Sequence, residues 1–187
     1  MNLYEIRDNA LKSGRGVFSV QQLANLTSSS KAIAKVYAAR LVAKGLAQRI
    51  IRGQIAFTND ERVIAAQVVE PSYISLESAL LIHGLIQQIP KYIECVTPTT
   101  SRKIPSAGIS YHRIPPALLF GYERVKSGND YYFLALPEKA LIDGAYLRAY
   151  SKGLMQELMK KINNKKLKEL LKQIPASQRK RIEGELL

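Results

Sequence analysis

The sequence predicts an α+β protein: an N-terminal winged helix-turn-helix, followed by a small mixed α/β domain with a largely antiparallel sheet and a basic helical C-terminus. Three observations lead to this prediction. Helical patterns and a hairpin pattern fill residues 1–70, short β-prone runs lie between two helical patterns in the middle, and lysine-rich amphipathic segments end the chain. We therefore expect one domain over residues 1–70 and a second over residues 71–187, with the boundary at Glu70-Pro71.

The first domain is expected to contain three helices. Ser19 and Gln22 form a Ser-x-x-Gln capping box at the start of the second helix. The polar run Thr27–Ser30 is a turn that offers N-caps to a third helix over about residues 30–44, which Gly45 closes. Two helices joined by a short polar turn, the second richer in basic residues, are the helix-turn-helix arrangement.

A β-hairpin is expected directly after the third helix. Two β-prone runs, Leu46–Ile51 and Gln54–Thr58, flank a turn at Arg52-Gly53, where glycine suits a backbone with positive φ. A hairpin in this position is a wing.

Two stripes of apolar residues compete for the buried face of the third helix. The stripes are Ala34, Ala38, Leu41 and Val42, or Ile33, Val36, Tyr37 and Leu41. We favour the first stripe because it leads into Gly45-Leu46. It leaves four residues free for a DNA groove: Lys35, Val36, Ala39 and Arg40.

The remaining surface of this domain suits a phosphate backbone. A helix N-terminus presents free amide groups to phosphates, and arginines on a wing reach the backbone or a minor groove. The candidate DNA-binding residues are Ser28, Ser29, Ser30, Lys31, Lys35, Arg40, Arg49 and Arg52. The alternative is a protein-docking module in which Lys35 and Arg40 are only solvated.

The net charge of +13 comes from 28 Lys plus Arg against 15 Asp plus Glu. Residues 1–70 hold ten basic and five acidic side chains, residues 71–149 eight and six, and residues 150–187 ten and four. The excess of positive charge therefore lies at both ends of the chain. Such a distribution favours a polyanion, either nucleic acid or an acidic protein face, although a basic proteome or a solvated helix face gives the same number.

The middle of the chain reads as a small sheet between two helices. The expected helices cover Ser75–Leu85, with Ser75 as N-cap, and the segment that begins at Pro137; the expected strands are Ile93–Thr97, Ile109–Ile114, Tyr122–Val125 and Tyr131–Ala135.

No pattern in this domain predicts catalysis. His83 and His112 lack metal-ligand spacing, and we expect a packed or capping role for the first and the polar side of a strand for the second, where it could join a basic recognition surface. Glu138 is expected to be a helix-cap or surface acid, and Cys95 a buried thiol. We expect no enzyme activity, no catalytic residues, no cofactor and no metal.

Leu154–Ile174 is an amphipathic segment with seven lysines from Lys152 to Lys172, and Asn163-Asn164 is a point where it breaks or bends. A last short helix to Leu187 is expected after Pro175, with Ser177 as a cap. Either this tail packs on the middle domain with its lysines outward, or it extends a DNA footprint or meets an acidic partner. A membrane-surface role is disfavoured because aromatic anchors are missing.

Six segments together resemble the AbiEi family of antitoxins from type IV toxin–antitoxin systems. In chain order they are "ARLVAKGLAQRIIRGQIAF", "YISLESALLIHGL", "ECVTPTTSRK", "ISYHRI", "FGYERV" and "LPEKALIDGAYL", and the resemblance covers about residues 15–150. It implies that the winged helix binds operator repeats in double-stranded DNA and represses the operon, through the Ser28–Lys31 turn, Lys35, Arg40, Arg49 and Arg52. It also implies that a domain beginning near Ser72 antagonises a nucleotidyltransferase-like toxin.

Three functions are weighed from the sequence. The first is a transcriptional autorepressor that is also an antitoxin; the second is a winged-helix regulator with a sensing or dimerisation domain and no toxin partner; the third is a nucleic-acid-processing enzyme. We favour the first. A homodimer on DNA is an open alternative: repressors commonly read paired half-sites as symmetric dimers, but the sequence shows no coiled-coil seam that enforces one. The N-terminus lacks the apolar segment of a signal peptide and no apolar run spans a bilayer, so a cytoplasmic location and no membrane partner are expected.

Overall fold

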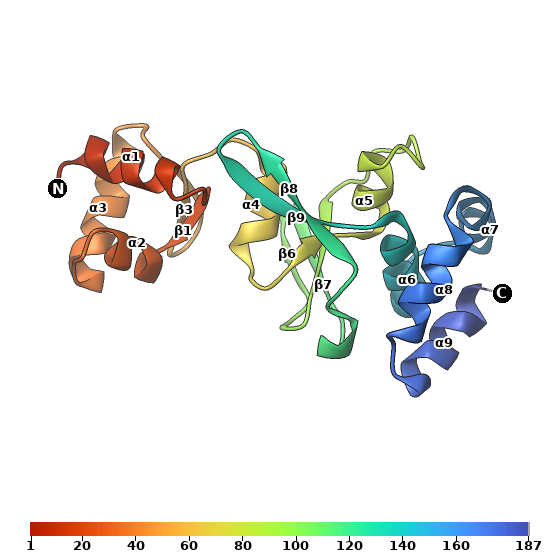
Figure 1. Cartoon of the computed structure of the whole chain (residues 1–187). Coiled ribbons are helices and arrows are strands. Elements are labelled where there is room, and N and C mark those ends of the chain that lie inside the picture. The colour runs from red at the N-terminus through yellow and green to blue at the C-terminus, as the bar shows by residue number, and fades with distance from the viewer. Residues whose placement is uncertain (187) are drawn as a thin grey trace. The chain divides into compact units, whose positions relative to one another are not determined.

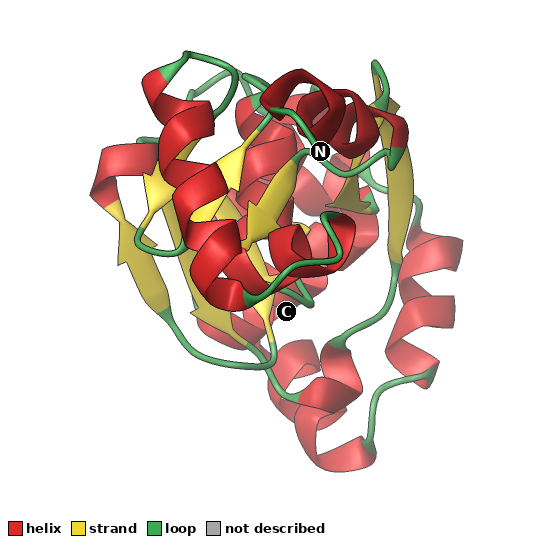
Figure 2. Ribbon diagram, turned by 90° about the vertical axis from the view of Figure 1, so that its left-hand side faces the viewer, coloured by secondary structure: helices red, strands yellow, loops and turns green. Residues whose placement is uncertain are grey.

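The computed structural model describes residues 1–186 and is a mixed α+β protein of two compact units (Figures 1 and 2). Unit 1 consists of Met1–Glu70 together with Val125–Tyr132, and unit 2 of Pro71–Arg124 together with the chain from Phe133 onward. One division thus falls between Glu70 and Pro71. The segment 125–132, which was expected in the second domain, clusters with the first 70 residues.

Unit 1 begins with helices and strands in the order helix, strand, helix, helix, strand, strand, helix. The elements are α1 (Leu3–Lys12), β1 (Val17–Ser19), α2 (Val20–Leu26), α3 (Lys31–Ala43), β2 (Gln48–Ile51), β3 (Gln54–Ala56) and α4 (Glu61–Val68). The strands form an antiparallel sheet in the order β1-β3-β2. The first three helices share a core in which Ile6, Leu23 and Leu41 are fully buried.

The starts of these helices follow from local capping. The hydroxyl of Ser19 accepts a hydrogen bond from the Gln22 backbone N–H at 3.2 Å, and the Gln22 amide oxygen accepts one from the Ser19 N–H at 2.8 Å. The capping box predicted from the sequence is therefore confirmed. Asn2 and Glu5 form a second capping box at the start of α1.

Helix α4 was not predicted from the sequence. All six residues from Val63 to Val68 are buried, so the segment shows no alternation between an apolar and a polar face. Its one buried amide, Gln67, accepts hydrogen bonds from the backbone N–H groups of Gly16 at 3.0 Å and Val17 at 3.1 Å. The helix is thus held against the beginning of β1.

Segment 125–132 joins unit 1 through side chains of α4 and of the turn before it. The amide nitrogen of Gln67 donates to the Tyr131 carbonyl at 2.8 Å, and the Arg62 guanidinium lies 5.3 Å from the centre of the Tyr132 ring. The Ser127 hydroxyl donates to the Asp60 carboxylate. Three separate contacts explain why this segment clusters with residues remote in sequence.

Unit 2 contains most of a six-stranded sheet and five helices of the described chain. Its elements, with two strands that reach into segment 125–132, are β4 (Tyr73–Ile74), α5 (Leu76–Ile82), β5 (Ile93–Thr97), β6 (Arg102–Ile104), β7 (Ile109–Arg113), β8 (Tyr122–Ser127), β9 (Asp130–Ala135), α6 (Pro137–Leu147), α7 (Lys152–Lys161), α8 (Asn164–Lys172) and α9 (Ala176–Leu186). Two short 3-10 turns lie at Pro105–Ala107 and Pro116–Leu118.

The sheet of unit 2 is mixed, so the prediction of a largely antiparallel sheet is confirmed only in part: antiparallel pairs are present, but parallel pairs lie between them. Its strand order is β6-β7-β5-β4-β9-β8, with β5 parallel to β7 and β4 parallel to β9. Strands β4 and β5 pair antiparallel, as do β6 and β7. Parallel neighbours need a long connection between them, and pairing over such distances leaves no local sequence signal.

The C-terminal tail packs within unit 2. A break at Asn163 separates α7 from α8, and the Asn163 side chain accepts hydrogen bonds from the backbone N–H groups of Lys165 and Lys166. Leu167, Leu170 and Leu171 of α8 are buried, whereas the lysines of this helix are exposed. The tail therefore packs with its lysines outward. Helix α9 is described as far as Leu186, so the expected end at Leu187 lies outside the described residues.

Candidate nucleic-acid interface

Helix α3 buries the stripe of residues that the sequence favoured. Ala34, Ala38 and Leu41 are between 0% and 6% exposed, whereas Ile33 and Val36 of the competing stripe are 49% and 47% exposed. The prediction of the buried face is confirmed. The exposed face consequently includes all four residues expected there: Lys35, Val36, Ala39 and Arg40.

The three serines before α3 build the turn that leads into the helix. Ser28 has a left-handed backbone with φ of +50°, and the Ser29 hydroxyl lies 2.7 Å from the hydroxyl of Thr27. Ser30 is the N-cap and accepts a hydrogen bond from the Ile33 N–H at 3.3 Å. Two of the three hydroxyls thus have partners within the turn, and Lys31 is exposed at its end.

The β2–β3 hairpin is anchored to the start of α2. Gly53 in the hairpin turn has φ of +83°, and its carbonyl accepts a hydrogen bond from the Val20 N–H at 3.0 Å. Beyond the turn, the Gln54 amide donates to the Val68 carbonyl at 2.9 Å. Arg49 and Arg52 are exposed on this hairpin. Arg49 in β2 and Arg52 in the turn therefore belong to a hairpin whose turn and strand β3 are bonded to neighbouring elements.

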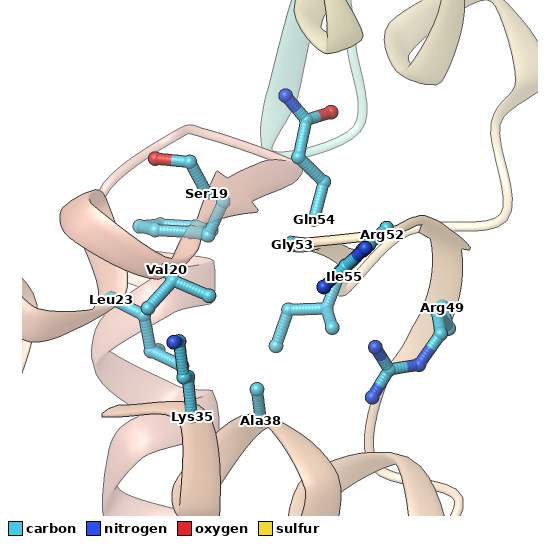
Figure 3. A pocket seen from close by; sticks show the side chains of 11 residues that line it. Ser19, Val20, Leu23, Lys35, Ala38, Arg49, Arg52, Gly53, Gln54 and Ile55 are labelled. Carbon is cyan, nitrogen blue, oxygen red and sulfur yellow. The ribbon is translucent and has the colours of Figure 1, made fainter. Parts of the chain in front are cut away.

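A pocket of about 360 Å³ lies between α3, the hairpin and the start of α2 (Figure 3). Its polar lining includes Lys35, Arg49 and Arg52, whose nitrogen-bearing ends lie around the same hollow. The other lining residues are Phe18, Ser19, Val20, Leu23, Ala38, Gly53, Gln54 and Ile55. The pocket thus combines an apolar floor with a rim of three cations.

The three rim cations carry uncompensated charge. None of them takes part in an ion pair with an acidic side chain of residues 1–186. Like charges around one hollow repel each other, and a bound anion relieves this repulsion. The arrangement is therefore suited to an anionic ligand.

The structure brings together three of the eight residues proposed from the sequence. Lys35, Arg49 and Arg52 line one pocket, whereas Arg40 and the Ser28–Lys31 turn do not line it. Sequence reasoning missed Ser19 and Gln54 as lining residues. They are brought to the same pocket because β1 pairs with β3, with Ser19 opposite Gln54 in the register, and no local pattern reports that pairing.

The other candidate residues lie in unit 2 and have structural partners. His83 is the C-cap residue of α5 by its backbone position, and the Nε2 atom of its ring lies 2.8 Å from the Ala135 carbonyl of β9, so the imidazole is packed against another element, the first of the two roles expected for it. His112 is 3.4 Å from the Glu94 carboxylate on the neighbouring strand.

Glu138 and Cys95 are both buried. Of the two roles expected for Glu138, a helix-cap or a surface acid, the surface acid was wrong: the residue is 7% exposed, and its carboxylate accepts a hydrogen bond at 3.0 Å from the N–H of Asn163, the N-cap residue of α8. The Cys95 thiol is 0% exposed, as predicted, and burial raises its pKa far above the usual range.

Residues 1–186 contain no group of three or more His, Cys, Asp or Glu side chains that is placed to hold a metal ion. None of the helices in this range has both the length and the apolar character that crossing a membrane requires.

Comparisons with known proteins give a likeness of fold. No family model matches the chain, and no curated protein matches its sequence. Among solved structures, the chain is similar to the crystal structure of the RV2827C protein from Mycobacterium tuberculosis, with a TM-score of 0.55 and 16% sequence identity. The similarity covers 98% of this chain and 75% of that one. At this identity it concerns the fold alone.

Proposed function

We propose that this chain is a DNA-binding transcriptional regulator that represses its own operon, with unit 1 acting as a winged helix-turn-helix. The observation that carries the proposal is the convergence of Lys35, Arg49 and Arg52 on one pocket between α3 and the β2–β3 hairpin. The order of helices and strands in unit 1 supports it, since α2 and α3 are joined by a short turn and the hairpin follows directly. In this proposal α3 is the recognition helix and the hairpin is the wing.

The exposed face of α3 supports a role in a DNA groove rather than in a protein core. Val36 and Ile33 stand beside Lys35 and Arg40 on this face, and apolar groups there suit the methyl group of thymine. In this arrangement the phosphate groups of the DNA backbone are contacted by Lys35, Arg49 and Arg52. Ser30 and the turn before α3 keep a structural role and present the helix N-terminus to a phosphate.

The experiment is binding of the purified protein to the DNA upstream of its own gene, at several salt concentrations, beside a Lys35→Ala/Arg52→Ala double variant. Saturable binding that prefers this DNA over a scrambled sequence, and that the double variant loses, is the expected result. Equal weak binding to every sequence, abolished by modest salt, would mean that charge alone attracts the DNA and would overturn the proposal. A circular dichroism spectrum shows whether the variant is folded.

We further propose that unit 2 antagonises a nucleotidyltransferase-like toxin. The support is the AbiEi-like series of segments, which extends through β5, β7, β8 and α6 of unit 2. The test is co-expression with the nucleotidyltransferase encoded beside this gene. Growth restored by the wild-type chain, and equally by the Lys35→Ala/Arg52→Ala variant expressed from an independent promoter, is expected. Absence of such a neighbouring gene, or no restored growth, favours a regulator without a toxin partner.

A further inference from the structure

We propose that the pocket between α3 and the β2–β3 hairpin binds one phosphodiester group of the DNA backbone. This group lies on the strand between two grooves, one contacted by α3 and the other by the wing. This inference rests on the proposed DNA-binding function and specifies what its central pocket holds. The lining residues that carry it are Lys35 from α3 and Arg49 and Arg52 from the hairpin.

The position of the pocket points to a backbone strand rather than to a base. In B-DNA the major groove, about 12 Å wide, and the minor groove, about 6 Å wide, are separated by one sugar–phosphate strand. A protein that places a helix in the first groove and a wing in the second must accommodate that strand between the two elements. In unit 1 the surface between α3 and the hairpin is this pocket (Figure 3).

The lining of the pocket matches the two halves of a nucleotide backbone. Three cationic side chains at the rim suit a phosphate, since arginine binds its oxygens in a bidentate manner and lysine acts as a point charge. The apolar floor includes Val20, which is half-buried, together with Phe18 and Ile55, which are 4% and 2% exposed. An apolar floor suits the carbon face of a deoxyribose ring next to the phosphate.

The pocket is held in shape before any ligand arrives. The Gly53 carbonyl is bonded to the Val20 N–H at 3.0 Å, and Ser19 is paired with Gln54 across β1 and β3. Ala38, on the α3 side, is 6% exposed and packs in the core of the unit. Because each wall is fixed to the same core, the backbone positions that carry the three cations are set before a phosphate binds.

The experiment measures the affinity of the full chain for its upstream DNA, with one neutral methylphosphonate placed at each backbone position in turn. The variants are wild type, a Lys35→Gln/Arg49→Gln/Arg52→Gln triple variant and Lys12→Gln as a control. Lys12 is an exposed lysine of α1 in the same unit that does not line the pocket. Far-ultraviolet circular dichroism confirms that each variant is folded.

At one backbone position per half-site, the methylphosphonate is expected to raise the Kd of the wild type by about fivefold or more. At the same position it should raise the Kd of the triple variant by less than about twofold. The slope of log Kd against log salt should fall by about 1 in the triple variant, as for loss of one phosphate contact, and stay unchanged in Lys12→Gln. Specific binding by the wild type without such a coupled position would overturn the phosphodiester inference and leave the proposed function standing. Absence of specific binding by the wild type would overturn both.

A free phosphate could satisfy the same three cations, so a second arm separates the two sources. DNA binding is measured in sodium phosphate and in sodium chloride of equal ionic strength. Equal inhibition by the two salts is expected, because a lone phosphate lacks the sugar that covers the apolar floor. Stronger inhibition by phosphate in the wild type than in the triple variant would identify a site for a free anion and would overturn the assignment to the DNA backbone.

Discussion

The Lys139 ammonium group donates a hydrogen bond to the carboxylate of Asp143, one turn further along α6, and both side chains are fully buried. The second carboxylate oxygen accepts hydrogen bonds from the hydroxyls of Tyr73 at 2.9 Å and Ser75 at 2.7 Å. Ser75 is the N-cap of α5, as expected, but its hydroxyl is directed to Asp143 instead of the helix amides. Burial lowers the pKa of Lys139, and the adjacent Asp143 charge opposes this shift.

The first prediction compares single and double substitutions in this ion pair. Asp143→Asn leaves the Lys139 charge buried without its counter-charge and should cost about 3–5 kcal/mol of the free energy of unfolding, as should Lys139→Met. The double variant Lys139→Met/Asp143→Asn removes both charges and keeps an acceptor for Tyr73 and Ser75, so we expect it to be more stable than either single variant. Urea unfolding of the full chain checks this order.

A control for this series is Glu169→Gln on the exposed side of α8, which should change stability by less than about 0.5 kcal/mol. If the costs of the two single substitutions simply add in the double variant, the two charges are not coupled and the prediction is wrong.

The second prediction uses two glycines of neighbouring helices. A Cβ atom at Gly144 of α6 would lie 1.9 Å from the Tyr150 ring, whose hydroxyl donates to the Ala140 carbonyl at 3.0 Å. Gly144→Ala should therefore displace the Tyr150 ring and lower the free energy of unfolding by about 1–3 kcal/mol. Gly153 of α7 has no atom within 4 Å of the added Cβ, so Gly153→Ala should stabilise the chain by about 0.5–1 kcal/mol. Thermal unfolding of both variants would contradict this account if their melting temperatures moved in the same direction.

The third prediction concerns the pH dependence of stability in unit 1. Asp130 is 8% exposed, and its Oδ1 atom has no hydrogen-bond partner among the described residues. Burial raises the pKa of this carboxyl; a hydrogen bond from Thr58 opposes the shift, and the negative charge of Asp60 adds to it. Because the folded-state pKa lies above the unfolded-state value, the ionised carboxylate destabilises the fold at neutral pH. This cost is lost as the pH falls through the folded-state pKa towards 3.8.

Asp130→Asn should accordingly stabilise the protein by about 1 kcal/mol at neutral pH, and the gain should shrink as the medium is acidified. Urea unfolding over a series of pH values measures both effects. Asp8→Asn, at an exposed position of α1, is the matched control and should show neither. A loss of stability at neutral pH in Asp130→Asn would mean that the charge itself is required there.

Local patterns were sufficient for α1, α2 and α3 and for the buried face of α3. The helical periodicity that places Ala34, Ala38 and Leu41 inward is a property of one helix. The Ser19–Gln22 capping box is a property of four consecutive residues. The same holds for the turn at Arg52-Gly53. Gly53 has a positive φ there, a backbone conformation that glycine adopts more readily than other residues. Such features depend on neighbours within a few residues, so they can be predicted from one sequence.

The features that were missed depend on partners distant in sequence. Residues 63–68 of α4 are all buried, and Gln67 among them bonds to β1 and to segment 125–132, so this part of the helix lacks the exposed polar face that marks a surface helix. The parallel pairs in the sheet of unit 2 join strands with other strands between them in the chain. For the candidate site, the basic residues could be proposed from their positions, but the pocket that gathers three of them depends on the β1–β3 pairing.

The last prediction tests the turn that fixes this pocket. Gly53 has φ of +83°, and a Cβ atom there would meet no atom within 4 Å, so a side chain is opposed by backbone conformation rather than by space. Gly53→Ala should lower the free energy of unfolding by about 1–2 kcal/mol. It should also move the carbonyl that accepts a hydrogen bond from the Val20 N–H, and this movement shifts Arg49 and Arg52 away from Lys35. Gly53→Asn is the matched comparison, because asparagine tolerates a left-handed backbone better than alanine. Affinity for the upstream DNA and urea unfolding should both rank wild type first, Gly53→Asn second and Gly53→Ala last; equal values for all three would show that the hairpin turn does not depend on this conformation.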